Sequence, residues 1–442
     1  MSENKSFEIK AEQRQSWWSI TMVWAGAMIC VSCLMVGGVL GNSLTLGQVA
    51  MSVIIGYGII AAYMSLIGMQ SCDLGLPTAI LAGGALGAKC SKYVVSAILA
   101  IACIGWFGVQ SAVCGISFSA MFLQIFNVDI PTWISIVFWG VIMLVTACYG
   151  FKGLKMLNTI AVPLLLVVCV YGLILALVNN DGMNAIAVYQ PAINMGMVFG
   201  INYTIATFAL GGVISADYCR FAKNRKDVVK SSFIGVIPAG FLILMIGAIL
   251  TIVTGQYDIS AVFVSFGSPV LGILGLLALI CGTWTTNVTN AYTGGLALSV
   301  MLGIDEKKSK IPTAAAGICG IIVALVGALA AAGFYAVFQN FLSILSALIP
   351  PLAGIMIADY WILGKGDKDN FKVIEGLYWP GLISLIAGIL VACSTGGTFA
   401  SYFPGLVQAL PILNVSFFVG PINGIVVSLV LYAILGSIIK KK

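Results

Sequence analysis

Histidine is absent from this sequence, and charged residues of both signs are scarce. Only 8% of the 442 residues are Asp, Glu, Lys or Arg, whereas 60% are hydrophobic. So few charges cannot coat the surface of a water-soluble globule of this size. The lack of histidine also removes the side chain that most often acts as a general base or metal ligand near neutral pH. A soluble protein and a histidine-based catalyst are therefore both excluded.

The 12 cysteines lie mostly inside apolar runs, where a thiol behaves as a small hydrophobic group. The one C-x-x-C motif, Cys30 to Cys33, falls within the first apolar run. No second pair and no histidine accompany it, so the spacing does not complete a metal site. Neither a disulfide framework nor a metal cluster is expected.

All 21 Lys and Arg residues occur in alternate gaps between the apolar runs. These gaps hold Lys5 to Arg14, Lys89 and Lys92, Lys152 and Lys155, Arg220 to Lys230, Lys307 to Lys310, Lys365 to Lys372, and Lys440 to Lys442. The other gaps carry only Asp129, Asp181 and Asp258 as charged residues. Because cytoplasmic loops retain Lys and Arg, the pattern predicts a multi-pass membrane protein with both termini in the cytoplasm. Residues 1–16 show no cleavable signal pattern and are expected to form a cytoplasmic N-terminal tail.

A membrane-spanning helix needs about 20 apolar residues, and twelve runs of the sequence are predicted to be spans. They are residues 17–39, 50–69, 93–123, 131–149, 157–178, 195–218, 232–254, 269–301, 313–332, 335–363, 377–393 and 417–439. The Gly-rich stretch 72–88 is expected to be a cytoplasmic loop or a short interfacial helix. The chain is thus predicted to be a single membrane domain.

The number of spans suggests an internal repeat. Five spans carry the chain from inside to outside, so the sixth runs opposite to the first, as two inverted repeats over 17–178 and 195–363 require. Residues 377–439 would add two further helices. In such transporters the first helix of each repeat is broken near the midplane. Glycines that could break the first and sixth spans, but could equally serve close packing, are Gly26, Gly37 and Gly38, and Gly200, Gly211 and Gly212. In the tenth span, Pro350 and Pro351 must interrupt the hydrogen-bond ladder.

No charged residue falls in the middle third of any predicted span. Proton-coupled carriers usually need a titratable group within the bilayer, so a sodium ion held by neutral oxygens is the better expectation for a coupling ion. A neutral, flat, polar solute fits best, although helix ends at a break can also hold a carboxylate. Asp217 and Arg220, three residues apart at the cytoplasmic end of the sixth span, can meet. They would form either a cytoplasmic gate or an ordinary interfacial ion pair.

Polar and aromatic residues gather in the third, sixth and eighth spans. Trp106 and Gln110 share one helical face and could stack on a planar ring and bond its edge, or could simply pack two helices together. Residues 283–290 include six polar side chains, more than back-bonding of Thr hydroxyls requires. Thr285, Thr286 and the carbonyl of Gly282 would supply three ligands for a small hard cation. In the sixth span, Thr207 and Phe208 stand just before a glycine pair.

These segments resemble the nucleobase-cation symporter family, and within it the cytosine permeases. The matching segments are Gly105 to Val109, Ser215-Ala216-Asp217-Tyr218 with Arg220-Phe221, Trp284-Thr285-Thr286-Asn287, and Leu348-Ile349-Pro350-Pro351 through Ile357-Ala358-Asp359-Tyr360. The resemblance implies an all-α polytopic membrane protein with 12 transmembrane helices. Its fold would be a LeuT-type five-plus-five inverted repeat plus two C-terminal helices.

The resemblance also implies which residues bind. Trp106 and Phe208 would sandwich the base, while Asn287 and the backbone near Thr207 would meet its edge, with Asn287 contributing more than Asn290. The cation would sit between carbonyls of the first span and the eighth span, and its expected ligands are Gly26, Cys30, Gly282, Thr285 and Thr286. Two departures matter: Cys103 replaces a Gln of cytosine permeases, and Gly282 replaces their ion-site Asn. Gln110 instead matches a Trp-x-x-x-Gln pattern of hydantoin and purine-type relatives.

The expected function is import of a neutral nucleobase, cytosine first, by alternating access and symport with sodium. Purines, other pyrimidines, hydroxymethylpyrimidine, hydantoin, allantoin and proton coupling stay open. A passive channel would need a continuous polar stripe on several spans, and an enzyme would need a catalytic constellation, so neither is expected. The expected partners are a small-molecule nucleobase and the lipid bilayer, without nucleic acid or organic cofactor. A monomer suffices for this function, and the sequence leaves the oligomeric state open.

Overall fold

The computed structural model of the chain describes residues 11–149, 151–179, 181–256, 269–304, 310–330 and 333–439, together with Ile9. Within these ranges the backbone is almost entirely helical, and the one β-type pairing is an isolated bridge between Gln15 and Ala222. Most of the predicted tail 1–16, residues 331 and 332 of the ninth predicted span, and the terminal lysines lie outside the described residues.

The helices of the first half are α1 (Trp17–Met28), α2 (Val31–Ser43), α3 (Leu46–Leu74), α4 (Thr78–Leu86), α5 (Ala88–Cys90), α6 (Ser96–Phe126), α7 (Thr132–Tyr149), α8 (Phe151–Asn179) and α9 (Gly182–Val188). Those of the second half are α10 (Gly196–Val213), α11 (Ser215–Cys219), α12 (Arg225–Thr254), α14 (Pro269–Leu302), α15 (Lys310–Ala328), α16 (Gly333–Leu348), α17 (Pro350–Ile357), α18 (Trp379–Thr395), α19 (Thr398–Tyr402), α20 (Pro404–Ala409) and α21 (Gly420–Ile438). Short 3-10 turns occur at η2 (Ala11–Gln13), η6 (Lys368–Asn370) and η7 (Pro411–Leu413), and π-helical turns at η3 (Ser91–Val95) and η5 (Ala358–Leu363).

The helices match the predicted spans. Among the described residues, eight helices are long and apolar enough to cross a membrane, and two bent pairs, α1 with α2 and α8 with α9, pass the same test together. The shorter apolar helices Thr132–Cys148 and Trp379–Thr395 account for the two remaining predicted spans. Each of the twelve predicted ranges therefore contains one helix or one interrupted helix, including the tenth, where α16 ends before the Pro350-Pro351 pair.

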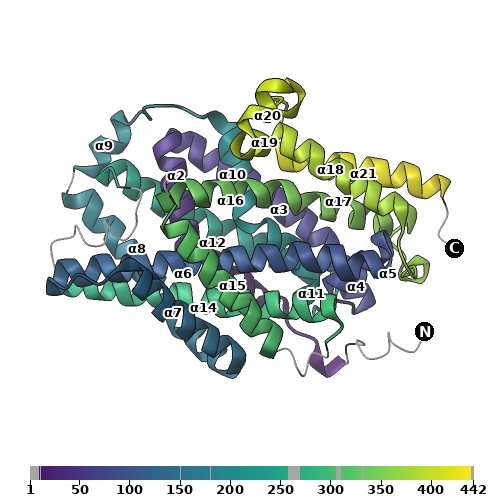
Figure 1. Ribbon diagram of the computed structural model, residues 1–442, viewed down its shortest axis with the longest axis horizontal. Helices are drawn as coiled ribbons and strands as arrows, with labels where there is room; N and C mark the ends of the chain where they lie inside the picture. Colours follow the sequence, from purple (N-terminus) through teal and green to yellow (C-terminus); the bar gives the residue numbers. More distant parts are fainter. Residues whose placement is uncertain are drawn as a thin grey trace.

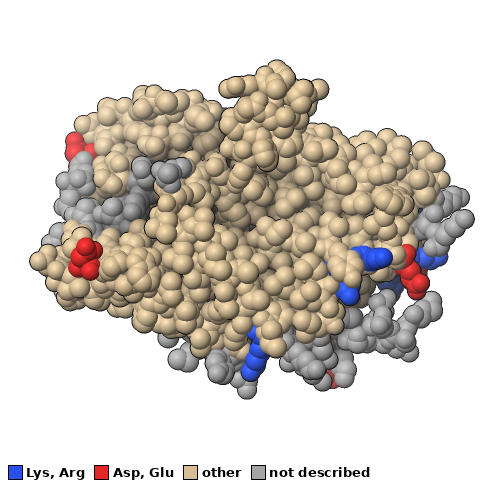
Figure 2. Space-filling model, in the orientation of Figure 1, with Lys and Arg blue, Asp and Glu red and all other residues tan. Residues whose placement is uncertain are grey.

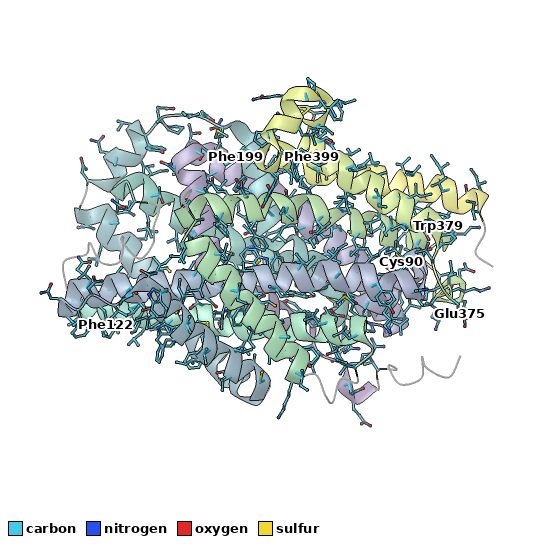
Figure 3. The ribbon with its side chains drawn as sticks, in the orientation of Figure 1. Cys90, Phe122, Phe199, Glu375, Trp379 and Phe399 are labelled. Atoms are coloured by element: carbon cyan, nitrogen blue, oxygen red, sulfur yellow. The ribbon has the colours of Figure 1, made fainter. Side chains whose placement is uncertain are left out.

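The long helix α6 runs through the middle of the molecule along its longest axis (Figure 1). Phe122 lies toward one end of this helix, and Cys90, the last residue of α5, lies beside the other end (Figure 3). Helices α18 and α21 pack against each other at one edge, as expected for helices added after two repeats (Figure 1). Figure 2 shows Lys and Arg at the right and lower edges of the molecule, while the charged side chains visible at the left end among the described residues are acidic.

Local sequence signals explain where several helices begin and end. Helix α3 starts with a capping box in which Thr45 and Gln48 satisfy each other's main-chain N–H groups. It ends at Gly75, whose φ of 69° lies in the left-handed region that favours glycine. Helix α12 begins after Asn224, whose side chain accepts from the Asp227 N–H at 2.9 Å.

The stretch 72–88, predicted to be a loop or a short interfacial helix, contains a short helix that is mostly buried. Helix α3 continues to Leu74, and α4 follows with most of its residues buried, packed against α17, α18 and α11. The physical reason lies at the start of α4, where the Thr78 N–H donates to the carboxylate of Asp217 at 2.8 Å. A carboxylate is favoured at a helix N-terminus, so this bond holds the short helix inside the bundle.

Candidate functional site

The first spanning helix is broken at Ile29 and Cys30, and α1 and α2 meet there at 57°. The Cys30 N–H donates to Met28 O at 3.0 Å instead of to Gly26 O, its acceptor in a regular helix. The Gly26 carbonyl therefore loses its helical partner, as expected for a cation ligand. The Cys30 carbonyl, expected to be free as well, accepts from the Leu34 N–H at 3.3 Å and starts α2. Ile29, which the prediction missed, has a carbonyl that accepts no hydrogen bond from the described residues.

Gly37 was one of the glycines predicted to break this helix. Gly37 lies inside α2, where a Cβ would overlap the backbone of Leu244 on α12. Gly247 of α12 is equally tight against Leu34 of α2. These glycines allow two helices to approach closely, so the packing interpretation of Gly37 is the correct one.

The sixth span is kinked at Phe208, whose φ of −133° and ψ of 15° are not helical although α10 continues on both sides. A Cβ on Gly211 would overlap the Phe208 ring, so glycine is needed where the ring folds back on its own helix. Thr207, directly before the kink, donates to Thr204 O at 2.7 Å and shares a 3.1 Å hydrogen bond with the Tyr57 hydroxyl of α3. The kink is therefore anchored to a neighbouring helix.

The two breaks meet through an aromatic contact that the sequence analysis missed. Trp24, one turn before the end of α1, packs edge to face on Phe208 with 6.2 Å between ring centroids. Trp24 is only 2% exposed, and its buried Nε1 has no hydrogen-bond partner among the described residues. An aromatic residue one turn before a predicted break was the signal available for finding it.

Helix α6 brings its predicted face to the same region. Gln110 donates from Nε2 to Ser32 Oγ, in the first turn of α2, at 3.3 Å, while its buried Oε1 has no partner among the described residues. Trp106 packs edgewise on Phe341 of α16, with 5.5 Å between centroids, and on Phe338 at 6.3 Å. The two predicted binding residues of α6 therefore lie between the broken first span and α16.

Helix α14 approaches the break through Gly282. A Cβ built on this glycine would lie 3.5 Å from Val31, the residue that opens α2. Thr285 and Thr286 both donate to the Gly282 carbonyl, at 3.0 and 3.1 Å. These are the back-bonds that Thr hydroxyls commonly make to main-chain carbonyls three or four residues earlier, and the other two threonines of this segment make them as well. The structure brings the predicted Gly282, Thr285 and Thr286 together.

Asn287 was predicted to meet the solute, and one side of its amide is bonded to α6. Its Nδ2 donates to Phe107 O at 3.1 Å and to Ser111 Oγ at 3.0 Å, and contacts Met143 of α7. Its buried Oδ1 has no partner among the described residues, so its contact with a solute stays a prediction. At about 100° per residue, Asn287 points roughly 140° away from Gly282. Asn290 points only about 80° away, and its buried Nδ2 has no partner among the described residues.

The predicted pair of Asp217 and Arg220 does not form a side-chain ion pair. Arg220 donates from Nε to the main-chain carbonyl of Asp217 at 3.2 Å, whereas the Asp217 carboxylate accepts from Thr78. Asp217 lies on α11, beyond the end of spanning helix α10. Burial raises the pKa of its carboxyl group, while the Thr78 hydrogen bond and the nearby Arg220 charge lower it.

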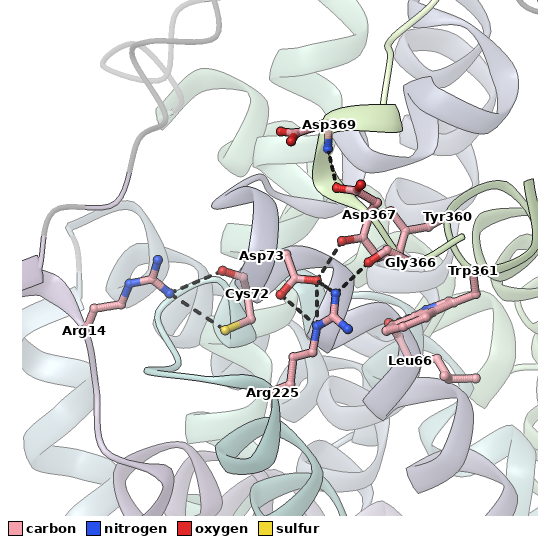
Figure 4. A network of polar contacts seen from close by, with 10 residues as sticks. All are labelled: Arg14, Leu66, Cys72, Asp73, Arg225, Tyr360, Trp361, Gly366, Asp367 and Asp369. Carbon is pink, nitrogen blue, oxygen red and sulfur yellow. Dashed lines mark hydrogen bonds and ion pairs between the residues drawn. The ribbon is translucent and has the colours of Figure 1, made fainter. Parts of the chain in front are cut away.

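Within the described ranges the ion pair joins Arg225, at the start of α12, to Asp73, at the end of α3 (Figure 4). Arg225 approaches both carboxylate oxygens, donates to Gly366 O at 2.7 Å and stacks over Trp361. Tyr360 donates to the same carboxylate at 2.7 Å. A surface cavity of about 400 Å³ borders this network. The sequence analysis missed it because its partners are 152 residues apart.

The tail before the first span is held at the same end of the molecule. Arg14 donates to Ala222 O and reaches the Cys72 carbonyl at 3.4 Å (Figure 4). Gln15 N–H donates to Phe221 O at 2.7 Å. These bonds tie the tail to the loop after α11.

Residues 8–420 match the family model described as permease for cytosine/purines, uracil, thiamine, allantoin. The chain is 26% identical to the cytosine permease of Escherichia coli (strain K12), over 100% of this chain and 97% of that protein. It is 24% identical to the hydantoin permease of Microbacterium maritypicum, over 90% of this chain and 85% of that protein.

The solved inward-facing structure of Mhp1 superimposes with a TM-score of 0.78 at 19% sequence identity, covering 95% of this chain and 90% of that one. The fold is thus the LeuT-type arrangement of a multi-pass membrane transporter, and the relatives are permeases rather than enzymes. The chain belongs to the family of permeases for cytosine/purines, uracil, thiamine and allantoin, the nucleobase-cation symporters that its motifs resemble.

Proposed function

We propose that this protein imports a neutral nucleobase, cytosine first among them, together with a sodium ion. The observation that carries the proposal is the meeting of two helix breaks, at Ile29–Cys30 and at Phe208, through the Trp24 ring. Main-chain groups at a break lack helical partners. Within a membrane such groups persist where they are buried in protein or line a solute path. Transporters built from inverted repeats bind solute and ion at such breaks.

The groups around the breaks suit a flat, neutral base. Trp106 on α6 and Phe208 on α10 offer aromatic surfaces from different helices, and ring stacking is the natural mode for a planar heterocycle. Gln110 Oε1 supplies an acceptor and Asn290 Nδ2 a donor, both buried without partners among the described residues. Buried polar atoms are normally paired, and the edge of a nucleobase offers both kinds of partner.

The cation would sit where α14 meets the broken first span. Thr285 Oγ1, Thr286 Oγ1 and Gly282 O form one side of this site. The carbonyls of Gly26 and Ile29, released by the bend, form the other in our proposal. The Cys30 carbonyl is the weaker candidate because the first turn of α2 already uses it. A site built only from neutral oxygens favours sodium over a proton.

Hydantoin or allantoin is the second candidate substrate. Gln110 stands four residues after Trp106, as in hydantoin and purine-type relatives, and a hydantoin permease is among the similar proteins. Proton coupling is the second candidate mechanism, and the buried carboxyl of Asp217 would be its acceptor. Placement in the bacterial inner membrane with cytoplasmic termini completes the proposal, supported by the distribution of Lys and Arg.

Uptake into proteoliposomes tests this function. We expect labelled cytosine to accumulate when an inward sodium gradient is imposed, and to equilibrate slowly when choline replaces sodium. Unlabelled hydantoin, allantoin and hypoxanthine added in excess rank the substrates by competition. Protein-free liposomes and the Trp106→Ala variant are the controls. Accumulation of none of these solutes in sodium or under a proton gradient would overturn the proposal.

A further inference from the structure

Two thiols meet at the break of the first spanning helix. The Sγ atoms of Cys30 and Cys33 are 3.1 Å apart, and each residue is 4% exposed. Cys30 also lies 3.2 Å from Ser32 Oγ. The transport proposal uses neither thiol, since it draws only on main-chain oxygens of this segment.

Local geometry explains why these two sulfur atoms face each other. Cys30 is the residue that precedes α2, with an extended backbone at φ −139° and ψ 160°, and Cys33 is the third residue of the helix. From this position a side chain folds over the first turn, as a capping Ser does when it reaches the third helical residue.

The separation allows a covalent bond without moving the helix. A disulfide is about 2.05 Å long, so the sulfur atoms must approach by roughly 1 Å. Rotation about the side-chain bonds of two residues within one turn supplies that movement. The other ten cysteines lack this arrangement in the described structure, where no second pair of sulfur atoms is in contact.

We infer that Cys30 and Cys33 are a reversible oxidation site, in which a small neutral two-electron oxidant converts the dithiol to a disulfide. With an azo oxidant such as diamide, one thiolate adds to a nitrogen of the N=N bond and the other nitrogen takes a proton. The second thiolate then attacks the bound sulfur, forming S–S and breaking S–N. The released nitrogen takes the second proton. Two thiols are thereby oxidised and the azo group is reduced to a hydrazine.

The disulfide would stiffen the junction between α1 and α2. Ser32 lies between this pair and Gln110, from which it accepts a hydrogen bond. Oxidation removes the S–H that Cys30 directs at Cys33 and fixes the first turn of α2. If the junction moves during transport, which rests on the proposed function, oxidation slows uptake.

The first test detects the disulfide between Cys30 and Cys33 directly and needs no transport substrate. The full-length protein in proteoliposomes is treated with diamide, denatured, and its free thiols are blocked with N-ethylmaleimide. We expect the peptide holding Cys30 and Cys33 to escape alkylation, to be 2 Da lighter than its reduced form, and to regain two alkylation sites after dithiothreitol. Full alkylation of both residues after diamide overturns the inference.

The second test measures the effect of the disulfide on transport. We expect diamide to lower cytosine uptake at least fivefold, with recovery after dithiothreitol, in the wild type and in Cys169→Ser, which loses a buried thiol of α8. Cys33→Ser and Cys33→Ala should take up cytosine at the wild-type rate, and diamide should not change that rate. If diamide lowers uptake by the Cys33 variants as much as by the wild type, or if the disulfide forms without changing uptake, the link between oxidation and transport is overturned. If no protein transports cytosine while the disulfide still forms, the proposed function fails and the oxidation site stands.

Discussion

Trp24 and Phe208 pack edge to face, with 6.2 Å between their ring centroids and 81° between their planes. One residue lies on α1, one turn before the first break, and the other forms the kink of α10. Edge-to-face aromatic pairs contribute stabilisation beyond that of the apolar area they bury. A movement of either broken helix therefore changes the packing of the other.

Replacing the predicted stacking rings should weaken base binding. We expect Trp106→Ala and Phe208→Ala to lower the affinity for cytosine, each by roughly twofold to tenfold, since an aromatic contact contributes about 0.5–1.5 kcal/mol beyond burial. Equilibrium binding to purified protein measures this. Trp133→Ala, which removes a ring that is 55% exposed, is the matched control and should bind normally. Unchanged affinity in both site variants would contradict stacking.

The two asparagines of α14 should have different roles. Asn287→Ala removes hydrogen bonds to Phe107 O and Ser111 Oγ, and leaving buried partners unpaired costs about 1–3 kcal/mol. We expect this variant to unfold at a lower temperature. Asn290→Ala should keep the wild-type unfolding temperature and bind cytosine more weakly. Thermal unfolding and binding are measured on both variants, and a binding loss confined to Asn287→Ala would contradict this assignment and support Asn287 as the base contact.

The ion pair of Asp73 and Arg225 should stabilise the end of the molecule where both termini are expected. Exposed pairs contribute about 0.2–1 kcal/mol, and the two-oxygen contact and the stacking over Trp361 place this one at the upper end. A double-mutant cycle of Asp73→Ala and Arg225→Ala in denaturant unfolding measures the coupling.

Two variants control this cycle. Arg225→Lys should recover less than half of the coupling, because an ammonium group lacks the planar fork. Lys226→Ala removes an exposed neighbouring charge and should leave stability unchanged. A coupling free energy of zero would show that the ion pair does not contribute to the stability of the fold.

Asp217 should make stability depend on acid pH. Its pKa is raised by burial, so folding favours the protonated form. The stability from this group is fully present below the unfolded pKa of about 3.9 and is lost as pH rises through the folded pKa. Asp217→Asn stays neutral and can still accept from Thr78. We expect its unfolding temperature to fall less than that of the wild type between acidic and neutral pH. Asp129→Asn, which changes an exposed carboxyl group, is the control. The same dependence of unfolding temperature on pH in Asp217→Asn and in the wild type would refute the role of Asp217.

Sequence patterns predicted the spans because apolar length and the distribution of lysine and arginine are one-dimensional signals. They also placed Phe208 at a break and brought Gly282, Thr285 and Thr286 into one cluster, since residues three and four apart share a helical face. Trp24, Ile29 and the Asp73–Arg225 pair were missed because their roles arise from helices that meet only in three dimensions. The hydrogen bonds of Asn287 to α6 were not predicted, because a motif gives a residue's order along the chain and not the direction in which its side chain points.

The cation should be coupled to the base through Thr285. Its hydroxyl stands 3.0 Å from the Gly282 carbonyl, beside the break that releases the carbonyls of Gly26 and Ile29. If ion and base bind the same conformation, each raises the affinity for the other by the same factor, because the coupling free energy is reciprocal. Cytosine affinity should therefore rise with sodium concentration at constant ionic strength with choline. Thr285→Ala should need more sodium for the same affinity, while reaching near wild-type affinity when sodium saturates.

Thr289→Ala, which removes another back-bonded hydroxyl of α14, is the control. Equal affinity in sodium and choline, with a strong pH dependence that Asp217→Asn abolishes, would assign the coupling to a proton instead.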